Sequence, residues 1–211
     1  MSVLDELRFF AATGKAGELF EIPIASEDSE LDRLYLIGVG DRSLSGLRTA
    51  GAALGKKVRG KALSVISLCA ITSDEIKAHG VSLALGAYQW NVKTDKAQEV
   101  PQLALATTDT KSVQIAATIS EALYTARDLI LTPSNIKNPL WMATEAKKIA
   151  EQKGLEISVL AGKELARFGG LRAVGQSSPK PGPRFIEVTY TPKGKARSAA
   201  ARSEEHTSEL Q

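Results

Sequence analysis

The segment Leu34-Tyr-Leu-Ile-Gly-Val-Gly40, followed by Asp-Arg-Ser43, carries the pattern on which the fold prediction rests. Its first four residues form a continuous apolar run, which is typical of a buried β-strand, and the two glycines favour a tight turn after it. Beyond the turn, apolar residues recur at helical spacing from Leu44 to Val58, and Ser43 is placed to cap that helix. The sequence therefore predicts a strand, a glycine turn and a helix in direct succession.

The same alternation of strand and helix continues along the chain. The apolar run Ala62–Ala70 predicts a second buried strand, and Thr72 with Glu75 has capping-box spacing ahead of the next helix. Gln102–Thr107 is a further strand candidate. Strands that alternate with helices of this length indicate an α/β layer with mostly parallel strands.

The second half of the chain contains the longest helical signal, Ser112–Leu131, which ends at a loop containing Pro133. The proline disfavours helix in the residue before it. Asn138 and Pro139 have the types favoured at the cap and first position of another helix, and Gly154 is placed to end that helix. The other expected elements are strands at Leu7–Ala12, Leu19–Ala25, Leu155–Leu160 and Arg184–Tyr190, and a short helix at Gly162–Phe168.

Together these elements predict a protein of the α/β class. We expect a three-layer first domain with a mostly parallel sheet, a linking helix, and the truncated start of a second α/β domain. The expected boundaries are residues 1–112 for the first domain, 113–137 for the linking helix and loop, 138–190 for the start of the second domain, and 191–211 for an unstructured tail.

The composition argues against nucleic-acid-binding, membrane-spanning and disulfide-rich proteins. The net charge of +3, from 27 basic and 24 acidic residues, is too balanced to indicate a nucleic-acid or membrane surface. No apolar run approaches the roughly 20 residues that span a bilayer, and the first residues lack a signal-peptide pattern. The single cysteine, Cys69, excludes a disulfide framework and is expected to be a buried structural thiol. A cytoplasmic location fits best.

The turn Gly38-Val-Gly40 stands where a dinucleotide-binding fingerprint would lie, between a strand and a helix. Ser43 occupies the position of the third glycine, and no acidic residue ends the strand Ala62–Ala70 to hold a ribose. A tight strand-to-helix turn requires glycine in any case. Nucleotide binding is therefore the less favoured interpretation, and it stays open as an alternative.

Other candidate residues do not form a recognisable site. His79 has Asp74 and Glu75 one turn away, but a surface or half-buried structural histidine is the favoured interpretation. His206 and Glu209 have ligand-like spacing in a tail without a core to hold them rigid. No catalytic, metal-binding or substrate-binding residue is assigned. The remaining candidates are the scattered carboxylates Asp41, Asp128 and Glu187 and the basic clusters Lys147-Lys148 and Lys180–Arg184, which are expected on solvated faces.

Several motifs between Ala126 and Tyr190 resemble a known family. Ala126-Arg-Asp-Leu-Ile-Leu-Thr-Pro-Ser-Asn135 is similar to the Ala-Arg-Asp-Leu-x-x-Thr-Pro-x-Asn segment that joins the two domains of leucyl aminopeptidases, the two-metal cytosol aminopeptidases. Gly169–Ser178 is similar to the family's Gly-x-Leu-x-Ala-Val-Gly-x-Gly-Ser, with Ser177 in place of a glycine. The Pro183-Arg184 pair precedes a strand, as in the family. A weaker resemblance extends over the earlier residues, so that it covers about residues 1–190.

The resemblance implies a metal-dependent exopeptidase, a protease that releases amino-terminal residues of the leucine type from peptides. Family members are homo-hexamers in which two divalent cations, manganese or zinc, polarise the scissile carbonyl and activate water. The family's ligands lie in Gly-Lys-Gly-x-Thr-Phe-Asp-Ser-Gly-Gly and Asn-Thr-Asp-Ala-Glu-Gly-Arg, and neither motif occurs here. We therefore expect an inactive amino-terminal fragment of such an enzyme, with no cation bound to it. The alternative is a non-catalytic nucleotide- or nucleic-acid-binding α/β module.

The end of the chain has a separate interpretation. Arg202-Ser-Glu-Glu-His-Thr-Ser-Glu-Leu-Gln211 resembles the in-frame translation of a sequencing-library adapter. On this interpretation the reading frame leaves the gene at about residue 191, and the His206 cluster has no biological meaning.

Overall fold

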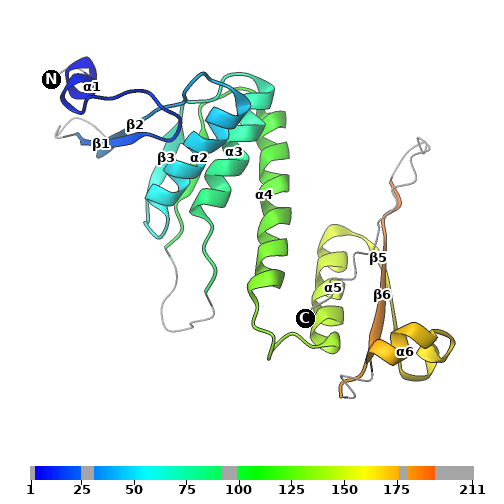
Figure 1. Ribbon diagram of the computed structural model, residues 1–211. Coiled ribbons are helices and arrows are strands. Elements are labelled where there is room, and N and C mark those ends of the chain that lie inside the picture. Colours follow the sequence, from blue (N-terminus) through cyan, green and yellow to red (C-terminus); the bar gives the residue numbers. More distant parts are fainter. Residues whose placement is uncertain (1–2, 25–30, 92–98, 176–179, 193–211) are drawn as a thin grey trace. The chain divides into compact units, whose positions relative to one another are not determined.

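The computed structural model describes residues 3–24, 31–91, 99–175 and 180–192 (Figure 1). The chain divides into two compact units, Met1–Leu131 and Thr132–Gln211. The division into four segments remains a prediction. The expected unstructured tail falls almost entirely on residues 193–211, which lie outside the described residues, as do His206 and Glu209.

The first unit alternates helices and strands, which confirms the predicted α/β class. Strands β1 and β2 pair antiparallel, with Leu19 opposite Ile37, whereas β3 and β4 pair parallel, with Ser64 opposite Gln102. Among the described residues, the predicted parallel pairing is therefore limited to β3 and β4. The elements of this unit are α1 (Val3–Phe9), β1 (Leu19–Pro23), β2 (Arg33–Ile37), α2 (Leu44–Val58), β3 (Ser64–Ser67), α3 (Ser73–Ala87), β4 (Gln102–Leu105) and α4 (Thr110–Leu131).

The predicted strand at Leu7–Ala12 is wrong, because these residues overlap helix α1. Two acidic residues, Asp5 and Glu6, lie in the first turn of that helix, where its dipole favours negative charge. Phe10, just beyond the helix, stacks on Phe20 of β1 with 4.9 Å between ring centroids. The apolar run therefore contacts β1 through Phe10, and the strand that pairs with β1 is β2.

The core of the first unit lies where α2 and α3 cover one face of β3 and β4. Its buried members are Leu54, Val58, Val65 and Leu83, and the inward-facing Leu103 and Leu105 of β4 pack against them. Helix α4 lies against the other side of α3 (Figure 1). The helices that follow β2 and β3 therefore form one layer over the parallel strands.

The opposite face of β3 is uncovered within the described residues, so the prediction of a buried strand is correct for one face and wrong for the other. Val65 and Ser67 are buried, but Ile66 is 64% exposed and the neighbouring Leu68 is 75% exposed. No described helix covers these side chains. The third layer of the expected three-layer domain remains a prediction.

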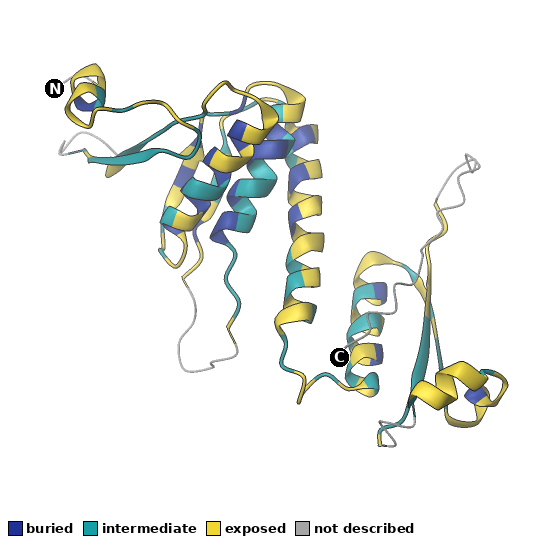
Figure 2. Ribbon diagram, viewed as in Figure 1, coloured by how far each residue is buried: buried dark blue, intermediate teal, exposed yellow. Residues whose placement is uncertain are grey.

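The second unit contains one long helix and an antiparallel strand pair. Asn138 caps α5, since its side chain accepts a hydrogen bond from Trp141 N at 2.9 Å, and Gly154 ends the helix at φ 66°, as predicted. Most of this unit is exposed or half-buried (Figure 2). Among the described residues, no helix is long and apolar enough to cross a membrane. The elements are α5 (Pro139–Lys153), β5 (Glu156–Ala161), the 3-10 helix η1 (Gly162–Arg167), α6 (Gly169–Gly175) and β6 (Arg184–Thr189).

Candidate functional site

The glycine turn after β2 is packed against the loop that precedes β1. A Cβ atom on Gly38 would lie 2.1 Å from the carbonyl oxygen of Lys15, so no side chain fits there. The Gly38 N–H donates to Glu18 O at 2.8 Å, and the Gly40 N–H donates to Gly14 O at 3.0 Å. Both amides are therefore already used by the protein and do not form a cradle for a phosphate group.

A carboxylate also occupies the amino-terminal end of α2. Ser43 caps the helix by accepting a hydrogen bond from Gly46 N at 3.1 Å, and its own N–H donates to Asp41 Oδ1 at 3.0 Å. These contacts from Ser43 hold the pKa of Asp41 below its usual value, which keeps the group ionised. A bound phosphate would face this negative charge. The geometry of the turn does not favour the nucleotide-binding alternative.

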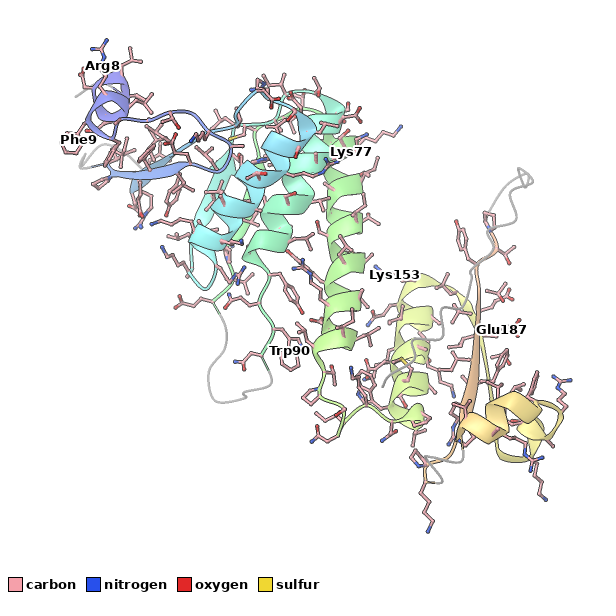
Figure 3. The ribbon with its side chains drawn as sticks, in the orientation of Figure 1. Arg8, Phe9, Lys77, Trp90, Lys153 and Glu187 are labelled. Atoms are coloured by element: carbon pink, nitrogen blue, oxygen red, sulfur yellow. The ribbon has the colours of Figure 1, made fainter. Side chains whose placement is uncertain are left out.

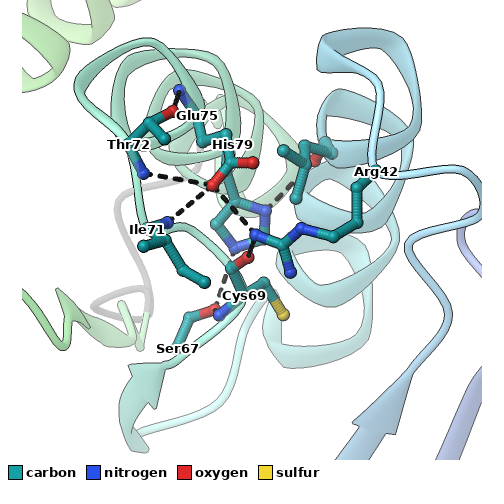
Figure 4. Close-up of polar contacts among 8 residues, drawn as sticks. Arg42, Ser67, Cys69, Ile71, Thr72, Glu75 and His79 are labelled. Carbon is teal, nitrogen blue, oxygen red and sulfur yellow. Dashed lines mark hydrogen bonds and ion pairs between the residues drawn. The ribbon is translucent and has the colours of Figure 1, made fainter.

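The loop between β3 and α3 holds a polar cluster centred on Glu75 (Figure 4). Its Oε2 atom accepts hydrogen bonds from Ile71 N at 2.8 Å, Thr72 N at 3.1 Å and Arg42 Nη2 at 2.9 Å. The two backbone donors, and then Arg42, lower the pKa of this carboxyl group. The same Arg42 nitrogen donates to Cys69 O at 3.3 Å. Glu75 thus closes the capping box and ties the turn before α2 to the loop before α3.

His79 is fully buried, so the expectation of a surface or half-buried histidine is wrong. Its Nδ1 atom lies 3.1 Å from Leu47 O, and its Nε2 atom lies 2.9 Å from Ser67 Oγ (Figure 4). Because a carbonyl oxygen only accepts, Nδ1 carries the proton and Nε2 accepts from the Ser67 hydroxyl. The imidazole therefore links α2, α3 and β3 in its neutral form.

The Ser67–His79 pair has the spacing of a nucleophile and its base, but its surroundings are those of a core contact. Ser67 is only 5% exposed and His79 is 0% exposed. The cavities beside α3 and α4 are lined by other residues. A substrate has no path to this hydroxyl in the described structure, and we assign the pair a structural role.

Burial of His79 predicts a loss of stability in mild acid. Burial is the main cause that holds the pKa of His79 below its ordinary value of 6.5. The unfolded chain then takes up a proton that the folded chain refuses, so the stabilisation is complete above about pH 6.5 and declines as the pH falls below it. Urea unfolding at about pH 7.5 and about pH 5.5 measures this dependence.

The matched control is His79→Gln, which removes the titrating group and keeps a polar side chain. Its free energy of unfolding should change less between the two pH values than that of the unchanged protein, because all other titrating groups are shared. An identical pH dependence in the two proteins would contradict the assignment.

The candidate carboxylates have separate local surroundings within their own units. Asp128 accepts a hydrogen bond from Tyr88 Oη at 2.5 Å, and burial followed by this carboxylate raises the pKa of Tyr88 to about 12. Glu187 lies on β6 (Figure 3). Cys69 was predicted to be buried, but it is half-buried. Among the described residues, no three His, Cys, Asp or Glu side chains are grouped closely enough to hold a metal ion. These residues therefore do not provide the donor set of a two-cation site.

The two basic clusters also have local partners. Lys148 pairs with Glu145 at 2.6 Å, one turn away on α5. Arg184 Nη1 donates to the carbonyl oxygens of Pro181, Gly182 and Pro183 at 2.9–3.1 Å, within its own loop. Lys147, Lys148 and Lys180 are exposed, as predicted, whereas Arg184 is half-buried.

The motif that begins at Ala126 fastens the end of α4 to the end of α3. Arg127 Nη1 donates to Leu85 O at 3.2 Å, and its guanidinium carbon lies 5.3 Å from the centre of the Tyr88 ring. The neighbouring Asp128 accepts from the Tyr88 hydroxyl. The sequence pattern pointed to this segment only through a resemblance, since the partners of Arg127 lie about 40 residues earlier in the chain.

Comparison with protein families and with curated relatives finds similarity to the cytosol aminopeptidases. Residues 124–201 match the family described as "Cytosol aminopeptidase family, catalytic domain". A probable cytosol aminopeptidase of Aquifex aeolicus (strain VF5) is 31% identical over 202 residues, which are 89% of this chain and 40% of that protein. One from Brucella ovis is 28% identical over 219 residues, 94% of this chain and 43% of that protein. The chain spans about two fifths of the length of the relatives it matches.

Solved structures with the same fold have lower identity. The bottromycin maturation enzyme BotP in complex with Mn matches with a TM-score of 0.78 and 23% identity, over 92% of this chain and 43% of that one. A mutant of tomato leucine aminopeptidase matches with a TM-score of 0.75 and 18% identity, over 92% and 42%. At these identities the similarity establishes the fold alone.

Proposed function

The chain is related along most of its length to the cytosol aminopeptidases, and on this premise we propose that the protein to which it belongs removes amino-terminal residues from peptides. The observation that carries the proposal is the continuity of the match, which covers 89% of the chain in the Aquifex relative. It includes the joining motif Ala126–Asn135, whose Arg127 and Asp128 both contact the end of α3. Similarity confined to one short motif would carry much less weight.

The reaction class that we propose is metal-assisted hydrolysis with two divalent cations, manganese or zinc. BotP, which shares the fold, is described in complex with Mn. Two cations would polarise the scissile carbonyl and generate a nucleophile from water. The described residues of this chain do not supply a donor set for them, so we assign no step of the hydrolysis to any residue here. We propose that this chain by itself is inactive.

The finer features of the proposal rest on the same relatives. We propose a preference for amino-terminal leucine, assembly into a homo-hexamer and a cytoplasmic location, in keeping with relatives named cytosol aminopeptidase and a structural relative named leucine aminopeptidase. In such an assembly the described first unit would act as a scaffold and not as part of the reaction centre. Light scattering of the longer protein tests the hexamer directly.

The deciding experiment begins with the source gene. Sequencing outward from the codons for Arg184–Thr189 should reveal a frame that continues into Gly-Lys-Gly-x-Thr-Phe-Asp-Ser-Gly-Gly and Asn-Thr-Asp-Ala-Glu-Gly-Arg. The protein made from that frame should hydrolyse leucine p-nitroanilide, lose this activity on chelation and regain it with Mn²⁺. The 211-residue chain should show none under the same conditions.

Three results would contradict these proposals. A continued frame without the two motifs, or a full-length protein whose hydrolysis survives chelation, would exclude a two-cation aminopeptidase. Leucine p-nitroanilide hydrolysis by the purified 211-residue chain would contradict the proposal that it is inactive.

A further inference from the structure

A cavity lined by three cationic side chains lies where the ends of α2, α3 and α4 meet. Its volume is about 340 Å³, which is at the lower end of the range for small-molecule sites. Lys56 and Arg59 come from the end of α2, and Arg127 comes from α4. The other lining residues are Ala52, Ser82, Leu85 and Gly86, so that no carboxylate of the described residues lines the cavity.

Two of the three cations are held in place by the backbone of α3. Arg59 donates from Nε at 3.0 Å and from Nη2 at 2.7 Å to the carbonyl oxygen of Gly86. Arg127 donates from Nη1 to Leu85 O and lies over the Tyr88 ring. These contacts use only part of the five N–H groups that each guanidinium carries, so donors remain for a ligand. Their positions are fixed before a ligand arrives, which lowers the entropy lost on binding.

Arginines near the end of a helix often stabilise its last carbonyl groups, and Arg59 and Arg127 do so for α3. Stabilisation of the last turn of α3 therefore explains the positions of Arg59 and Arg127, but not that of Lys56. Lys56 donates to no described carbonyl group and forms no ion pair with a described carboxylate, whereas the adjacent Lys57 pairs with Glu21 at 2.8 Å. Asp128, the carboxylate next to Arg127 in sequence, accepts a hydrogen bond from the Tyr88 hydroxyl and is not among the residues that line the cavity. The cavity therefore keeps an excess of positive charge.

We propose that this cavity binds a small oxyanion, a phosphate or carboxylate group of a metabolite, between Lys56, Arg59 and Arg127. Charge-assisted hydrogen bonds from guanidinium groups to such oxygens are among the strongest polar contacts in proteins. Ser82, which also lines the cavity, adds a hydroxyl donor. The existence of this site does not depend on the proposed aminopeptidase activity.

The test is titration of the 211-residue chain with inorganic phosphate and, in parallel, with citrate, followed by NMR at constant ionic strength. Saturable shifts should be confined to residues around the cavity, and the anion that binds more tightly identifies the ligand class. Lys56→Gln, at an exposed position, should preserve the fold and raise the dissociation constant about tenfold through loss of one charged contact. Arg59→Gln should raise it at least as much.

The matched control is Lys57→Gln, which removes the same charge one residue away, outside the cavity. It should change the dissociation constant less than about twofold, because exposed charges act weakly at a distance in salt. If Lys56→Gln and Lys57→Gln raise the dissociation constant equally, the effect reflects the net charge of the protein and not a contact in the cavity, which would overturn the proposal. The absence of saturable binding of either anion would also overturn it.

Discussion

Replacement of Gly55 by alanine is expected to lower the free energy of unfolding by about 3 kcal/mol, although alanine is the better helix former by about 1 kcal/mol. Gly55 lies in α2 at its contact with α3. A Cβ atom there would lie 2.2 Å from the carbonyl oxygen of Leu83 and 2.8 Å from Ala87 N. Both are backbone atoms, which cannot rotate away as the end of a side chain can. The two helices would have to separate, and the core beneath them would loosen.

The control for Gly55→Ala is Gly170→Ala, in helix α6. Apart from its own helix backbone and its chain neighbours, no described atom lies within 4 Å of the position that its Cβ would take, so the helix propensity is the main change. This variant should be neutral or up to about 1 kcal/mol more stable. Urea unfolding of both variants measures the difference. If the two substitutions shift the transition in the same direction by the same amount, the close approach of α2 and α3 is wrong.

Leu83→Ala is expected to destabilise the first unit by about 2–5 kcal/mol. Leu83 is 1% exposed and packs with Leu54, Val58 and Val65 in the core between the helices and the parallel strands. Its truncation removes buried apolar surface and enlarges the existing cavity between α3, α4 and β4, which it already lines. Rigid neighbours can fill the new space only in part, so the loss of packing adds to the loss of burial.

Leu68→Ala provides the matched control, since the same atoms are removed from a leucine that is 75% exposed. Its expected effect is within about 0.5 kcal/mol. Denaturant unfolding followed by circular dichroism measures both variants. A similar loss for Leu68→Ala would contradict the assignment of Leu83 to the core and of Leu68 to an exposed position.

Helix ends were predictable because their determinants are local. Ser43 and Asn138 cap their helices as expected, and Thr72 with Glu75 forms the predicted capping box. In each case the cap and its partner are only a few residues apart, so the sequence contains both members of the contact. The strands β5 and β6 were also anticipated, because each segment is rich in apolar residues and is flanked by glycine or proline, whereas their antiparallel pairing was not.

The candidate site was less predictable, because its contacts join distant parts of the chain. Arg127 meets Leu85 and Tyr88, and Lys56 and Arg59 reach the same cavity from another helix. No spacing rule connects these positions. The motif at Ala126–Asn135 marked the segment through its resemblance to a family, but the side chains that it holds together could be named only from the folded chain.

Periodicity, helix caps and motifs are local features of the amino-acid sequence, so they were enough to predict the α/β class, the order of most helices and strands, and the similarity to the aminopeptidases. Burial could be established only from the folded chain. His79 is buried because α2 and β3 bring Leu47 and Ser67 to its two ring nitrogens. Ile66 and Leu68 stay exposed, although they belong to the apolar run Ala62–Ala70. A hydrophobic pattern states which side chains favour burial. Whether they achieve it depends on the element that packs against them, and that element comes from a distant part of the chain.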